Sequence, residues 1–256
     1  GVPGIIHDAN AVLGRANRFL SRRVNAIATS LPGVLDRDPD LAGKTVTVGT
    51  PMRPAVLTAA AVPFASPEPN GPLRLLVVGG SQGARVMSDI VPGAIEKLEP
   101  MLWSRLILTQ QVRKEDMGRV RSIYERRRIN AELAPFFNDL PARLASSHLV
   151  ISRSGASTVA ELAAIGRPAI LVPLPHALDQ DQAARAVLLD RGKDKTYDEL
   201  IEPLRRSITA LLVSPGAWRR ASVASPAVSR RACLLIIYGS ADTARGRSDL
   251  TAKPGQ

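Results

Sequence analysis

Two glycine-rich segments contain the residue types best suited to binding a phosphate. Residues 79–84 (GGSQGA) follow the apolar run 75–78, and residues 152–158 (SRSGAST) follow residues 148–151. Each segment precedes a sequence with helical periodicity, so each predicts a helix start whose unpaired N–H groups and positive dipole end favour an anion. Ser81 adds a hydroxyl donor. A tight strand-to-helix turn with no ligand is the alternative interpretation of the first segment.

Thr158 and Glu161 are three residues apart and therefore share one face of the helix predicted at 158–165. A carboxylate one turn inside such a helix can accept hydrogen bonds from both hydroxyls of a ribose, as the acidic residue of dinucleotide sites does. The alternative is that Glu161 only complements the helix dipole.

Carboxylates and amides cluster at residues 179–182 (DQDQ), after the apolar run 169–172. This mixture of acceptors and paired donors is suited to recognising the hydroxyls of a sugar. A polar loop that ends in a helix N-cap has the same composition and is the alternative.

His7 and Asp8 follow the first apolar run, and a His beside an Asp suggests acid–base chemistry. Adjacent residues of an extended segment point to opposite sides, however. We therefore expect these residues to position or cap the chain and not to form a catalytic pair.

Short apolar runs alternate with helical periods between residues 73 and 172. The predicted strands are 73–78, 105–109, 131–134, 148–152 and 169–172, and the predicted helices are 85–98, 114–127, 140–146 and 158–165. This alternation predicts an α/β fold with right-handed crossovers and a mostly parallel sheet covered on both faces. Ligands of such sheets bind at the carboxyl ends of the strands, where both glycine-rich segments stand.

The first 72 residues have a different pattern. Strands are expected at 2–6, 24–29 and 45–48, and a helix at 11–24 with Leu13, Ala16, Phe19 and Leu20 on one face. Residues 50–72 contain six prolines, a density that opposes regular structure. We expect a domain boundary near residues 49–54.

The composition is typical of a globular protein. The chain has 256 residues, 45% hydrophobic and 22% charged, which excludes a wholly disordered or coiled-coil protein. Its apolar runs are much shorter than the roughly 18 residues that cross a bilayer. One cysteine, Cys233, excludes an internal disulfide and a multi-cysteine zinc site. Because the chain starts with Gly1 and not Met, we expect a fragment of a longer protein.

The net charge of +11 is concentrated near the carboxyl terminus. Residues 191–256 contain twelve Lys or Arg and six Asp or Glu, which gives this segment +6. We expect a basic tail with a helix at 197–212 and disorder at 239–256. Such charge attracts nucleic acid, anionic lipid or phosphorylated substrates, and charge alone does not choose among them.

Four motifs together resemble the MurG family of N-acetylglucosaminyltransferases, which act in peptidoglycan synthesis. They are His7-Asp8-Ala9-Asn10, Gly49-Thr50-Pro51-Met52-Arg53, Gly79-Gly80-Ser81-Gln82-Gly83-Ala84, and Arg153-Ser154-Gly155-Ala156 followed by Thr158 and Glu161. The resemblance covers residues 1–182, with the motifs in the family's order and spacing. It fades from about Ala183, and Thr50 and Arg185 both stand where the family tends to have Asn.

The resemblance implies a GT-B fold, in which two Rossmann-like domains face each other across a cleft. Residues 1–50 would end the first domain, residues 51–190 would form the donor-binding domain, and residues 191–256 would be a divergent, partly disordered tail.

The resemblance also implies a role for each part of the donor site. The Ser81 loop and Arg53 would contact the diphosphate, and Glu161 the ribose. The backbone near Phe136 and Phe137 would contact the uracil beside Leu140, and Asp181 and Gln182 would contact the sugar. The substrate-binding residues expected in full are Asn10, Arg53, Gly80, Ser81, Gln82, Gly83, Phe136, Phe137, Leu140, Ser154, Gly155, Ala156, Thr158, Glu161, Asp181 and Gln182.

The activity implied by the resemblance is inverting transfer of N-acetylglucosamine from UDP-N-acetylglucosamine to undecaprenyl-linked muramoyl-pentapeptide. The enzyme would be peripheral, at an anionic membrane surface on the cytoplasmic face of the bacterial inner membrane, with no cofactor and no nucleic-acid partner. The family's first half, which supplies the catalytic base, is absent ahead of Gly1. We therefore expect donor binding with little turnover.

Two other functions are weighed against this one. A nicotinamide-dependent oxidoreductase would use residues 79–84 for the dinucleotide and Glu96 or Glu99 for the ribose, but the full G-x-G-x-x-G spacing is absent. A nucleic-acid-binding module would use the basic tail, but zinc-ligand spacing, a recognition-helix signature and interleaved aromatics are absent.

Overall fold

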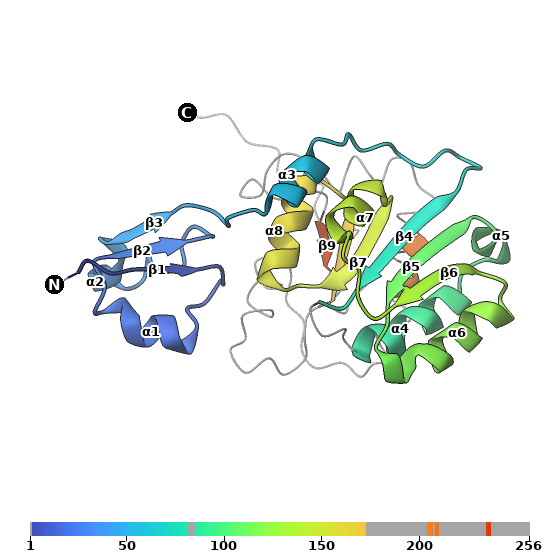
Figure 1. Cartoon of the computed structure of the whole chain (residues 1–256), viewed down its shortest axis with the longest axis horizontal. Helices are drawn as coiled ribbons and strands as arrows, with labels where there is room; N and C mark the ends of the chain where they lie inside the picture. Colours follow the sequence, from blue (N-terminus) through green and yellow to red (C-terminus); the bar gives the residue numbers. More distant parts are fainter. Residues whose placement is uncertain (1, 81–84, 173–203, 207, 210–233, 237–256) are drawn as a thin grey trace, which may run out of the picture.

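The protein contains two parallel sheets, and the connecting segment 48–53 leads from the small sheet to the first helix that packs on the large one (Figure 1). The computed structural model describes residues 2–80, 85–172, 204–206, 208–209 and 234–236. The small sheet has three strands and the large sheet six.

The small sheet has the order β1 (Ile5–Asp8), β2 (Ala26–Thr29), β3 (Thr45–Thr47), with α1 (Arg15–Ser21) and α2 (Pro39–Ala42) in its connections. One face packs on a small core made of Ile6, Leu13, Ile27, Leu35 and Leu41. The other face is open among the described residues, because Ile5 is 71% exposed and Val46 is 59% exposed.

Asp8 organises the chain between β1 and α1. Its buried carboxylate accepts hydrogen bonds from Asn10 N (2.8 Å), Gly14 N (3.0 Å) and Asn17 Nδ2 (2.9 Å). The Asn17 amide also donates to His7 O (3.0 Å). Asp8 therefore caps a turn, as predicted, and α1 presents polar groups to the sheet.

The predicted helix at 11–24 is wrong in extent. Helix α1 is shorter because residues 10–14 turn around the Asp8 carboxylate instead of joining the helix. Its apolar side chains do not pack on the sheet: Phe19 is 65% exposed and Leu20 is 38% exposed.

The large sheet has the order β6-β5-β4-β7-β8-β9, and all neighbouring strands are parallel. The strands are β4 (Leu73–Val78), β5 (Leu106–Gln111), β6 (Asn130–Ala134), β7 (Leu149–Arg153), β8 (Ala169–Val172) and β9 (Leu234–Ile236). The predicted α/β alternation is confirmed from β4 to β8. Strand β9, which pairs with β8, lies within the expected tail, where Leu204 and Ile208 are also buried in the core.

Helices cover both faces of the large sheet (Figure 1). One core lies under α4 (Arg85–Glu96), α5 (Pro100–Trp103), the 3-10 turn η1 (Lys114–Asp116) and α6 (Met117–Arg126). The other lies under α3 (Pro54–Ala60), α7 (Leu140–Ser146) and α8 (Ala156–Ile165). Helix α3 contradicts the expectation that residues 50–72 lack regular structure. Its Pro54 stands in the first turn, where a missing N–H breaks no helical bond.

Arg167 joins the carboxyl ends of α3, α7 and α8. Its side chain is buried and donates to Ala145 O (2.9 Å), Ile165 O (3.0 Å) and Val62 O (2.9 Å). Helix ends carry partial negative charge on their unpaired carbonyls, which a guanidinium with five N–H donors is suited to satisfy. Burial lowers the pKa of Arg167, so its charge depends on these carbonyls for stabilisation.

We expect Arg167→Met to lower the free energy of unfolding by about 3 kcal/mol, because it leaves the buried carbonyls of Ala145 and Ile165 without this donor. Urea unfolding followed by circular dichroism measures the change. Arg126→Met is the matched control: that side chain is 61% exposed and pairs with Glu96 at 3.5 Å. Its effect should stay below about 0.5 kcal/mol, and equal losses in the two variants would contradict the role of Arg167.

His148 ties the amino ends of β4 and β7 together, at the sheet edge opposite the glycine-rich segments. The ring Nδ1 of His148 accepts from Arg74 N (3.1 Å), and the backbone N–H of His148 donates to Arg74 O (2.9 Å). Burial, and secondarily the charge of Arg74, lowers the pKa of His148 below 6.5. The folded protein therefore binds the His148 proton at a lower pH than an unperturbed histidine does.

Because the unfolded chain binds the His148 proton at a higher pH than the folded protein, stability should fall as pH decreases below about 6.5. His148→Asn keeps an acceptor for Arg74 N–H but does not titrate. We expect urea unfolding between pH 7.5 and 5 to show a smaller loss of stability for this variant. Parallel pH profiles would show that His148 does not contribute.

Candidate functional site

The main cavity, of about 590 Å³, opens at the carboxyl ends of β4, β5 and β6. Chain order reverses between β4 and β7, which are neighbours in the sheet, and such a switch point is where ligands of open α/β sheets bind. The N-cap residue of α3 and first-turn residues of α7 and α8 border the same space. The lining residues are Thr50, Pro51, Met52, Arg53, Val78, Gly80, Gln111, Phe136, Phe137, Asn138, Leu140, Pro141, Ser157, Thr158 and Glu161.

The first glycine-rich segment enters the cavity at Gly80. This residue has φ +90°, a backbone conformation that residues other than glycine rarely adopt. The preceding N–H, that of Gly79, donates to Gln111 Oε1 (3.1 Å) and so is not free for a phosphate. Ser81, Gln82 and Gly83 lie outside the described residues.

The second glycine-rich segment leads from β7 into α8. Gly155 is the N-cap residue, and no side chain caps the helix. The cavity is lined by Thr158 and Glu161 but not by Ser154, Gly155 or Ala156. The Ser154 hydroxyl is fully buried and has no hydrogen-bond partner within the described part of the chain.

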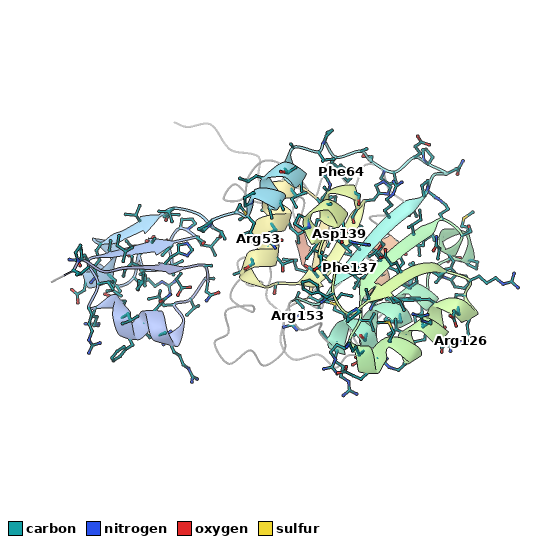
Figure 2. The ribbon with its side chains drawn as sticks, in the orientation of Figure 1. Arg53, Phe64, Arg126, Phe137, Asp139 and Arg153 are labelled. Atoms are coloured by element: carbon teal, nitrogen blue, oxygen red, sulfur yellow. The ribbon has the colours of Figure 1, made fainter. Side chains whose placement is uncertain are left out.

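Arg53 and Glu161, 108 residues apart, form an ion pair across the cavity wall, with Nη2 and Oε1 separated by 2.7 Å. Figure 2 shows Arg53 where the connecting segment reaches α3. The Arg53 side chain is 63% exposed and that of Glu161 12%. An ion pair with one exposed partner contributes little to stability, about 0–1 kcal/mol. A ligand can therefore replace it at low cost.

The loop after β6 contributes one fixed and one exposed phenylalanine. Phe137 is buried, and the Arg143 guanidinium lies 4.4 Å from its ring centroid. Arg143 also donates to Asp139 Oδ1 (2.7 Å) and lowers the pKa of that carboxyl. Phe136 is 61% exposed, and Leu140 lines the cavity beside it. In this loop Phe137 is therefore fixed by its contact with Arg143, whereas Phe136 is accessible to a ligand.

One further predicted site residue lies away from the cavity, and two further ones fall outside the described residues. Asn10 belongs to the small sheet, where its N–H donates to Asp8, and it does not line the cavity. Asp181 and Gln182, expected at the sugar, lie outside the described residues, so their role stays a prediction.

Gln111 is a cavity residue that the sequence did not indicate. The predicted strand ended at residue 109, whereas β5 continues to Gln111 and so brings this side chain to the carboxyl end of the sheet. The other unpredicted lining residues are Thr50, Pro51, Met52, Val78, Asn138, Pro141 and Ser157. The signal that could have indicated Gln111 is an amide side chain at the end of a strand.

The described residues contain no cluster of three or more His, Cys, Asp or Glu that could hold a metal ion. Within that same part of the chain, no helix has the length and apolar character needed to span a membrane.

Residues 74–212 match the glycosyltransferase family 28 C-terminal domain. A relative from Bradyrhizobium diazoefficiens is 82% identical over 189 residues, which cover 74% of this chain and 52% of the relative. Another, from Bradyrhizobium sp. strain BTAi1, is 65% identical over 261 residues, which cover 99% and 67%. Both are named UDP-N-acetylglucosamine–N-acetylmuramyl-(pentapeptide) pyrophosphoryl-undecaprenol N-acetylglucosamine transferase. The chain spans between about half and two thirds of these relatives.

Among solved structures, MurG from Acinetobacter baumannii aligns with a TM-score of 0.61 and 30% identity, over 83% of this chain and 58% of that chain. UDP-GlcNAc 2-epimerase from Neisseria meningitidis aligns with a TM-score of 0.52 and 15% identity, over 80% and 57%, and shows similarity of fold alone. The predicted GT-B fold is confirmed by these alignments and by the parallel sheets. The chain belongs to glycosyltransferase family 28.

Proposed function

We propose that this protein binds UDP-N-acetylglucosamine in the main cavity and acts in the transfer of N-acetylglucosamine to undecaprenyl-linked muramoyl-pentapeptide. The observation that carries the proposal is that the Gly80 turn, the Glu161 carboxylate and the Phe136 loop line one space. A volume of about 590 Å³ is typical of small-molecule sites. The names of the two relatives supply the donor and the acceptor.

Three parts of the cavity correspond to three parts of the donor. The Glu161 carboxylate accepts hydrogen bonds from the ribose hydroxyls, and the loop at Phe136 and Phe137 faces the uracil. Arg53 and the amino end of α8 offset the charge of the diphosphate.

The same groups act on the leaving group during transfer. An acceptor hydroxyl attacks the anomeric carbon while the bond from that carbon to the UDP oxygen breaks, so the configuration inverts. The proton of the hydroxyl passes to a base, which we do not assign to any described residue. Negative charge grows on the departing diphosphate, where Arg53 and the α8 N–H groups stabilise it.

Donor binding exchanges one interaction for others. Arg53 Nη2 and Glu161 Oε1 form an ion pair at 2.7 Å. When the donor binds, Arg53 pairs with the diphosphate and Glu161 accepts hydrogen bonds from the ribose. The ion pair holds Glu161 at the cavity wall before binding. Because this pair, whose Arg53 partner is exposed, contributes only about 0–1 kcal/mol, its loss reduces donor affinity little.

Isothermal titration calorimetry with UDP-N-acetylglucosamine, UDP and NAD tests the proposal. We expect Kd values between about 1 µM and 1 mM for the two uridine compounds, the usual range for enzyme substrates, and no heat with NAD. Glu161→Gln should weaken UDP binding about tenfold, the cost of losing a charged hydrogen bond. Glu125→Gln, on an exposed part of α6, should not change it. Binding of NAD alone, or of none of the three, would contradict the proposal.

We also propose that α1 holds the protein at an anionic membrane surface, on the cytoplasmic face of the bacterial inner membrane. Exposed Phe19 and Leu20 stand among the exposed arginines Arg15, Arg18 and Arg22. An apolar patch surrounded by cations is suited to enter the interface of a bilayer with anionic head groups. The face of α1 turned toward the sheet is polar, which leaves these apolar side chains outside the core.

Co-sedimentation with phosphatidylglycerol vesicles tests this role. Phe19→Ser with Leu20→Ser should reduce the bound fraction severalfold, and 0.5 M salt should reduce binding of the original protein because it screens the arginines. Met101→Ser, which changes a side chain that is 74% exposed on α5, is the control. Equal binding of all three proteins would exclude α1 as the contact.

A further inference from the structure

We propose that Gln111 is a positioning residue that sets the spacing between two turns of the main cavity, the turn after β4 and the turn after β6. The inference rests on the proposed function, because it concerns a nucleotide diphosphate that touches both turns. The observation behind the inference is that the buried side-chain amide of Gln111 forms a hydrogen bond to each of the two turns.

Gln111 is the last residue of β5, which lies between β4 and β6 in the sheet. Its Oε1 accepts from Gly79 N (3.1 Å), and its Nε2 donates to Pro135 O (3.1 Å). The side chain is 6% exposed and forms part of the cavity wall. The side-chain amide of Gln111, on the middle strand β5, therefore links the turn after β4 to the turn after β6.

The two turns serve different parts of the proposed ligand. Gly79 leads into Gly80, at the diphosphate end, and Pro135 leads into Phe136, at the base end. A uridine diphosphate that engages both turns gains affinity when their spacing is already correct, because less conformational freedom is lost on binding. The affinity of a ligand that contacts only one turn does not depend on this spacing.

The neighbouring Gln110 provides a matched control. Successive strand residues point to opposite faces, so Gln110 points away from the cavity. Its Nε2 donates to Met87 O (3.3 Å), and its Oε1 accepts from the Tyr124 hydroxyl (2.5 Å). Gln110 is fully buried and does not line the cavity. Replacing it changes the packing of α4 and α6 on the same strand without touching either turn.

The experiment compares Gln111→Met with Gln110→Met, since methionine has a similar length but forms no strong hydrogen bond. The Kd values for UDP and for uridine are measured by calorimetry and competition, together with the melting temperature. For Gln111→Met we expect UDP affinity to fall about tenfold, with less than a twofold change for uridine. Gln110→Met should lower the melting temperature and leave the ratio of the two affinities unchanged.

The ratio of affinities distinguishes a positioning role from a structural one. An unchanged ratio in Gln111→Met, in a protein that binds UDP, overturns the inference and leaves the proposed function intact. Failure of the unsubstituted protein to bind UDP overturns both. Should Gln111→Met fail to fold, Gln111→Glu keeps the acceptor for Gly79 N–H and loses the donor to Pro135 O. It should show the same fall in the ratio, and an unchanged ratio overturns the inference.

Discussion

The geometry of the cavity depends on the hydrogen bonds that the Arg167 guanidinium donates to carbonyls at three helix ends. These carbonyls lie at or just beyond the carboxyl ends of α3, α7 and α8. The N-cap residue of α3 and amino-terminal residues of α7 and α8 line the cavity. A seven-residue helix is only about 10 Å long, so holding one end restricts the position of the other. The cation also donates to the buried carbonyls of Ala145 and Ile165, which lie at helix ends where carbonyls lack an intrahelical partner. Electrostatics at one edge of the domain thus positions binding groups at the other.

Local patterns were sufficient to predict the strands from β4 to β8 and the two glycine-rich turns. Each depends on residues adjacent in sequence, such as the apolar runs or the glycine at φ +90°. Proline was interpreted as a breaker at residue 54, although a first-turn position tolerates it. The apolar face of α1 was predicted as a face but turns outward, because Asp8 requires the polar face for its hydrogen bonds.

Tertiary pairs could not be predicted in this way. The partners in the Arg53 and Glu161 ion pair are 108 residues apart, and neither residue type indicates the other. Arg167 follows a glycine, where an arginine usually suggests an exposed loop, and only the convergence of three helix ends explains its burial. Gln111 similarly depends on the register that places it opposite Ala134 in β6. The motifs located the cavity, but the contacts that shape it come from the fold.

The open face of the small sheet affects the behaviour of the chain in solution. Ile5, Ala26, Ala28 and Val46 share this face by strand register, and parallel sheets are ordinarily covered on both sides. Aliphatic side chains on adjacent strands that the described residues leave uncovered favour association between copies and aggregation. The net charge of +11 opposes such association through mutual repulsion. Colloidal stability should therefore decrease as added salt screens that repulsion, so low ionic strength suits concentrated samples.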